Sequence, residues 1–268
     1  MNSMEDIPMM KRIVAVLLAG LMLGALASCA KNDGGITDDT VINIGTQEMT
    51  YQDTNGDTFT YEYLTSTTVR ITGFSGNYEP HEVVIPAKIE NRDVTEIGAE
   101  AFTSSSCIKS LKIDAALVCI GNYAFSNCQS LESISFPSSL EEIGRCAFYG
   151  CSSLVELNFP ASLKSIDGGA FKDCAAIADV TFPSALLEIG EVAFSGCHAL
   201  TEITLAEGIT TVGAQAFYNC DAVTSMTLPA SLTEIGDWAF ATQIKILTDD
   251  QIHVVEGSVA DQLIASQR

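Results

Sequence analysis

The stretch that decides the fold is LESISFPSSLEEIGRCAFYGC, residues 131–151, because its apolar positions recur along the chain every 23 residues. Its Ala-Phe pair, at 147 and 148, is the third of seven such pairs. A fixed period in the low twenties is typical of stacked coils, each of which buries its apolar face only against its neighbours. The sequence therefore predicts a solenoid with a phenylalanine spine, formed by Phe102, Phe125, Phe148, Phe171, Phe194, Phe217 and Phe240.

Each repeat contains one segment of the form LxxIxF, residues 131–136 in the type repeat, which predicts a short strand. Stacking such strands predicts about seven coils with a parallel sheet on one face and short turns or helical pieces on the other. Proline follows the strand in four coils, where the chain must turn. A glycine comes after the next apolar pair, and we expect it to permit a tight bend with positive φ. The glycines at that position are Gly98, Gly121, Gly144, Gly190, Gly213 and Gly236, with Asp167 in one coil.

The first 28 residues have the features of a bacterial export signal. Lys11 and Arg12 precede an almost wholly apolar run at 13–23, which is too short to span a bilayer. The tetrapeptide LASC at 26–29 resembles the lipobox, in which the cysteine is lipidated, so Cys29 is the predicted anchor. The alternative is an ordinary cleaved signal. Residues 29–46 are polar and glycine-bearing, which predicts a flexible tether.

Both ends of the array carry segments that break the rhythm. Residues 47–72 alternate around Asn55-Gly56, which predicts a β-hairpin cap, and the solenoid is expected over 73–248. Residues 249–268 predict a C-terminal cap. In that region we expect a last strand, formed by 244–247 and 252–255, and a short helix starting at 257.

The net charge of −21 bounds the partners. Nucleic acid and anionic lipid would be repelled, whereas a basic ligand would be favoured. The alternative is a merely solvated acidic exterior. The sequence leaves the oligomeric state open.

Chemistry-bearing residues are sparse in this sequence. Five cysteines keep the 23-residue beat without any CxxC pair, so a ladder of thiols is expected rather than a zinc site. Disulfides between adjacent coils are possible, but buried thiols acting as small apolar fillers are favoured. Cys197 and His198 are neighbours in sequence and are not expected to converge as a nucleophile pair. We therefore predict a non-enzymatic protein without metal, cofactor or catalytic residue. For the sole tryptophan, Trp238, packing in the terminal coil is favoured over stacking on a ligand.

The outward residues of the strands are the better candidates for function. Alternation along each strand places two polar residues per coil on the sheet face. We expect them to bind a protein or glycan, and the alternative is that they only solvate an exposed sheet. The first column is Ser133, Glu156, Asp179, Glu202 and Ser225, and the second is Ser135, Asn158, Thr181, Thr204 and Thr227.

The consensus IGxxAFxxCxxLxxIxFPxSLxx resembles the BspA-like, treponemal-type leucine-rich repeats of bacterial surface proteins. The resemblance covers about residues 65–265, including an entrance segment at 73–76 and a tail at 254–259. It implies a leucine-rich repeat solenoid that is exported and often lipid-anchored in Bacteroidota. Some members are adhesins for host matrix proteins or other bacteria, and the family has no shared catalytic residue. We expect a lipid-anchored protein at the outer membrane or cell surface, with an envelope scaffold in the periplasm or outer membrane as the alternative.

Overall fold

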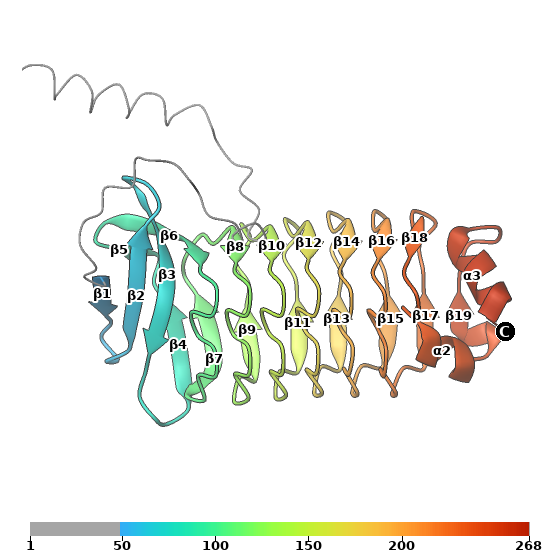
Figure 1. Cartoon of the computed structure of the whole chain (residues 1–268), viewed down its shortest axis with the longest axis horizontal. Helices are drawn as coiled ribbons and strands as arrows, with labels where there is room; N and C mark the ends of the chain where they lie inside the picture. Colours follow the sequence, from blue (N-terminus) through green and yellow to red (C-terminus); the bar gives the residue numbers. More distant parts are fainter. Residues whose placement is uncertain (1–48, 268) are drawn as a thin grey trace, which may run out of the picture.

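The computed structural model describes residues 49–267 and confirms the predicted solenoid. About eight coils of roughly 23 residues stack side by side along the long axis (Figure 1). The predicted signal peptide at 1–28, the lipidated Cys29 and the tether at 29–46 lie outside the described residues.

The N-terminal end is an antiparallel hairpin that turns into the parallel array. Strands β1 (Met49–Gln52) and β2 (Thr58–Tyr63) pair antiparallel around Asn55 and Gly56. Strand β3 (Thr68–Ser75) pairs antiparallel with β2 and parallel with β6 (Arg92–Ile97), and β5 (Lys88–Ile89) pairs with β6. From the hairpin and β3, Phe59 and Phe74 place their ring centroids 6.3 and 4.9 Å from that of Phe102. The hairpin therefore covers the apolar end of the spine.

The solenoid has two ladders of strands, whereas the sequence predicted one. The first, which we call the long sheet, continues from β6 through two-residue strands such as Glu142–Ile143. The isoleucine or valine of each strand is buried or half-buried, and the constant repeat length keeps every dipeptide in register. These strands are β8 (Cys119–Ile120), β10 (Glu142–Ile143), β12 (Ser165–Ile166), β14 (Glu188–Ile189), β16 (Thr211–Val212) and β18 (Glu234–Ile235).

The second ladder, which we call the LxxIxF face, is the predicted one. It is divided into the groups β4-β7-β9, β11-β13 and β15-β17-β19. Its strands are β4 (His81–Ile85), β7 (Ile108–Ile113), β9 (Ser133–Ser135), β11 (Glu156–Asn158), β13 (Asp179–Thr181), β15 (Glu202–Thr204), β17 (Ser225–Thr227) and β19 (Ile252–His253).

The phenylalanine spine lies inside the stack, as predicted. All seven side chains are buried, and the rings of adjacent coils lie nearly parallel. Their centroids are 4.8 Å apart for Phe102 and Phe125 and 5.5 Å apart for Phe217 and Phe240. Rings at these separations stack on one another and hold successive coils together.

The prediction of positive φ at the repeat glycines is wrong. None of the six adopts a positive φ; the need for glycine comes from close approach of neighbouring coils. A Cβ on Gly190 would lie 2.5 Å from the backbone nitrogen of Gly168. The left-handed residue comes two positions later, as at Tyr123 and Trp238, where φ is 57° and 64°.

The C-terminal cap begins with a helix at the place where a strand was expected. Helix α2 (Ala241–Ile246) covers most of residues 244–247, so that part of the prediction is wrong. Ile244 and Leu247 are both buried and lie three residues apart, which is the spacing of one helix face. After the 3-10 turn η1 (Asp249–Gln251), β19 pairs with β17, and α3 (Val259–Gln267) forms the expected helix.

Candidate ligand-binding surfaces

The predicted polar columns lie on the outside of the LxxIxF face. Both residues of each pair are exposed on β9, β11, β13 and β15, and half-buried on β17. The residue between them, such as Leu157 or Ile203, points into the core. We call the ten outward residues, two on each of these five strands, the polar stripe.

The polar stripe continues from coil to coil although its strand pairing is interrupted. Glu156 lies opposite Asp179 on paired strands, and Glu202 lies opposite Ser225. Across the two interruptions the coils remain joined one residue before the strand. There the Val155 N–H donates to the Glu132 carbonyl at 3.3 Å and the Thr201 N–H to the Ala178 carbonyl at 3.2 Å. The stripe is therefore one surface.

The centre of the polar stripe carries uncompensated negative charge. Neighbouring strands of a ladder are about 4.8 Å apart, so Glu156 and Asp179 are close like charges. Within residues 49–267, neither these two nor Glu202 forms an ion pair with a lysine or arginine. Glu202 accepts a 2.6 Å hydrogen bond from the Thr204 hydroxyl. This arrangement favours a cationic partner group.

The ends of the stripe carry residues that the sequence analysis missed. Lys112 on β7 lies opposite Ser135, and His253 on β19 lies opposite Thr227. Lys112 stands 23 residues before Ser135, so extending the repeat alignment by one coil would have found it. His253 follows the cap helix, where the period no longer holds.

The cysteine ladder is a packing device. All five repeat cysteines are buried free thiols, as favoured over disulfides between coils. Each donates to the carbonyl of the phenylalanine 26 residues earlier, for example Cys174 to Phe148 at 3.0 Å. Burial raises the pKa of Cys128 and Cys220 to about 12, which keeps these thiols protonated and poorly nucleophilic. Gln243 takes this place in the last coil, with its Nε2 donating to the Phe217 carbonyl at 3.1 Å.

Cys197 and His198 do not converge. The Cys197 thiol donates to the Phe171 carbonyl inside the stack, whereas the exposed His198 ring lies 3.0 Å from the Asp221 carboxylate. Over residues 49–267, no group of three or more His, Cys, Asp or Glu side chains is placed to hold a metal ion. No helix in the same part of the chain is both long enough and apolar enough to cross a membrane.

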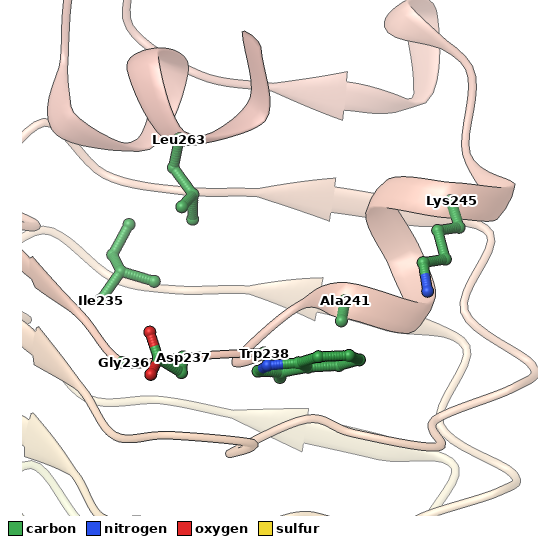
Figure 2. A pocket seen from close by; sticks show the side chains of 7 residues that line it. All are labelled: Ile235, Gly236, Asp237, Trp238, Ala241, Lys245 and Leu263. Atoms are coloured by element: carbon green, nitrogen blue, oxygen red, sulfur yellow. The ribbon is translucent and has the colours of Figure 1, made fainter. Parts of the chain in front are cut away.

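A second surface feature lies at the C-terminal end, where the last coil meets the cap helices. A cavity of about 300 Å³ is bounded by Trp238 and Asp237 from the last coil, Lys245 from α2 and Leu263 from α3 (Figure 2). A second cavity of about 540 Å³ adjoins it along β18 and shares Ile235 and Leu263 with it. We call the two together the terminal groove.

Trp238 is not packed into the terminal coil, contrary to the favoured interpretation of its sequence position. Its side chain is 55 % exposed, and Lys245 Nζ lies 5.6 Å from the centroid of its ring. In Figure 2 the ring is seen edge-on, with one face directed toward the space below Leu263.

Comparison with known proteins identifies the repeat. The family model for the BspA type leucine rich repeat region matches in six copies, over residues 95–198 and 164–251. A leucine-rich repeat protein of Treponema pallidum, known from its crystal structure, is 28 % identical with a TM-score of 0.65; the alignment covers 72 % of this chain and 89 % of that one. A leucine-rich repeat protein from Bacteroides ovatus is also 28 % identical, with a TM-score of 0.52, and the alignment covers 69 % of this chain and 55 % of that one. No curated protein matches this chain.

Proposed function

This chain belongs to the BspA-type leucine-rich repeat family, and we propose that it is a lipid-anchored binding module of the bacterial cell surface. The family consists of bacterial surface-type repeat proteins that generally serve as interaction scaffolds rather than as enzymes. In this proposal Cys29 carries the lipid, residues 29–46 extend the solenoid from the outer membrane, and the polar stripe binds a protein or glycan.

The observation that carries the proposal is the exposed acidic centre of the polar stripe. Glu156, Asp179 and Glu202 lie on successive coils and have no lysine or arginine partner within residues 49–267. Bringing like charges together costs free energy, which a cationic partner surface would recover. Large aromatic side chains are absent from the ten positions, so the binding is polar and gains strength from repetition along the stripe.

The test of the stripe is a charge-neutralised variant. Glu156→Gln, Asp179→Asn and Glu202→Gln are combined, and binding to a panel of extracellular-matrix proteins and polysaccharides is compared with that of the natural chain. The matched control combines Glu100→Gln, Glu188→Gln and Glu191→Gln, which changes the net charge equally at exposed positions off the stripe. We expect the stripe variant alone to lose binding, and we expect binding to weaken as salt rises. Equal binding by both variants would contradict the role of the stripe.

Protease shaving of intact cells tests the location. An antibody against residues 49–267 reports the solenoid, and a periplasmic protein reports lysis. We expect the solenoid to be cleaved on intact cells. Protection until lysis would contradict surface display and would favour a scaffold in the envelope. A Cys29→Ala variant that still fractionates with membranes would contradict the lipid anchor.

A further inference from the structure

We propose that the terminal groove is a carbohydrate site in which a neutral pyranose ring of a glycan stacks on Trp238. The site is separate from the polar stripe and does not depend on the function proposed for it. Trp238 lies on the turn side of the last coil, whereas the stripe lies on the LxxIxF face.

The floor of the site is an open aromatic face. An indole ring that packs in a terminal coil would be buried, but Trp238 leaves 55 % of its surface exposed beside a cavity of about 300 Å³. That volume lies at the lower end of the range for small-ligand pockets, which is about 300–1,000 Å³. The C–H face of a pyranose is apolar and flat enough to cover an indole face, while its rim carries hydroxyl groups.

The polar groups around the ring match a neutral, hydroxyl-rich ligand. Figure 2 shows the Asp237 carboxylate and the Lys245 ammonium on different sides of the same space. A carboxylate accepts hydrogen bonds from hydroxyls, and an ammonium donates to them. Their charges cancel within the cavity, in a chain whose net charge is −21. A cationic ligand would meet Lys245 beside the ring, and an anionic ligand would meet Asp237 and the acidic surroundings.

The adjoining cavity points to an oligosaccharide rather than a single sugar. It runs along β18, and its walls contribute the hydroxyls of Thr211 and Thr233 and the carboxylate of Glu234. These groups can hydrogen-bond a second sugar unit linked to the one on Trp238. A peptide could instead pair with β18, which is the last strand of the long sheet. However, β18 is only two residues long and offers few backbone hydrogen bonds, so the aromatic face favours a glycan.

The sole tryptophan of the chain makes the test specific for this site. The full chain is titrated with neutral hexasaccharides of glucose, mannose and N-acetylglucosamine while the fluorescence of Trp238 is followed. We expect at least one to give a saturable change in emission and to protect the ring from quenching by acrylamide. Calorimetry on Trp238→Asn is expected to show about thirtyfold weaker binding, as for a tryptophan that dominates an interface.

The matched control is Tyr123→Asn. Tyr123 is an exposed aromatic residue at the equivalent position of an earlier coil, with φ 57° against 64° for Trp238. Asparagine tolerates this left-handed backbone, so both variants should fold. We expect the control and the charge-neutralised stripe variant to keep full saccharide affinity. The proposal is overturned if no saccharide alters the emission, if Trp238→Asn binds saccharide as well as the natural chain does, or if only extended peptides give a saturable response.

Discussion

Truncating one ring in the middle of the spine should be among the most destabilising single changes in this chain. The Phe171 side chain has 0 % exposure and lies between the rings of Phe148, at 5.1 Å and 3°, and Phe194, at 5.3 Å and 14°. Replacing a buried phenylalanine with alanine generally costs about 3–5 kcal/mol, and more where the surroundings cannot collapse. Here the coils on both sides are fixed by backbone hydrogen bonds, such as that from the Phe171 N–H to the Ala193 carbonyl at 2.8 Å. We therefore expect Phe171→Ala to lower the free energy of unfolding by an amount in the upper half of that range.

The assay is urea unfolding followed by circular dichroism, with Phe136→Ala as the control. Phe136 is the same residue type in the same array, but it is only half-buried and contacts the Phe148 ring edge-on at 6.0 Å. Its truncation should cost about 1–2 kcal/mol, in the ordinary range for single substitutions. If Phe171→Ala cost no more than Phe136→Ala, the spine would not hold the stack together and the reasoning would be refuted. Because repeat arrays can unfold in steps, the slopes of the two transitions are compared as well.

Three further outcomes follow from contacts elsewhere in the chain. Gly190→Ala should destabilise the solenoid by about 1–3 kcal/mol in urea unfolding, because its Cβ would meet the Gly168 backbone; unchanged stability would contradict the close approach of the coils. Iodoacetamide at pH 8 should modify the half-buried Cys146 and spare the five ladder thiols until the protein unfolds, because burial raises their pKa; early labelling of the ladder, seen by mass spectrometry, would argue against it. The pKa of His81 is raised by hydrogen bonds to the Glu79 carbonyl and the buried Asp57 carboxylate, so its stabilising effect should be complete below about pH 6.5 and lost as pH rises through the raised pKa; melting of His81→Gln should differ most from the natural chain at low pH, and the opposite trend would count against it.

The sequence was sufficient for whatever repeats. Residues that recur every 23 positions, such as the phenylalanines and the ladder cysteines, can be assigned to the core because only a stack brings them together. The hairpin at Asn55-Gly56 could be predicted for a local reason, since that dipeptide favours the turn in any context. The outward columns follow from alternation along one strand.

What the sequence did not show depends on contacts between coils or on the loss of the period. The Glu-Ile dipeptides of the long sheet are too short to be recognised as strands; only their stacking in register makes them one. The repeat glycines suggested a bend, but their constraint is the neighbouring backbone, which one coil alone does not reveal. Helix α2 was missed because an apolar run such as 244–247 suits a strand as well as a short helix. Gln243 replaces a cysteine, so its role in the last coil could be seen only from its hydrogen bonds.

The terminal groove can be understood as a consequence of ending a periodic structure with helices. Within the array, each coil fits the next because their shapes are the same, and the Gln215 N–H, for instance, donates to the Asp237 carbonyl of the following coil at 2.9 Å. The last coil has no such copy to receive Trp238, and α2 and α3 have a different surface relief, so they cover its apolar centre but not its edge. Stability there comes from Phe240, Gln243 and Ile244, which are buried, and it places no demand on the residue at 238. A large aromatic side chain can therefore occupy that position for recognition without cost to the fold, in the same way that the polar stripe can vary over an unchanging core.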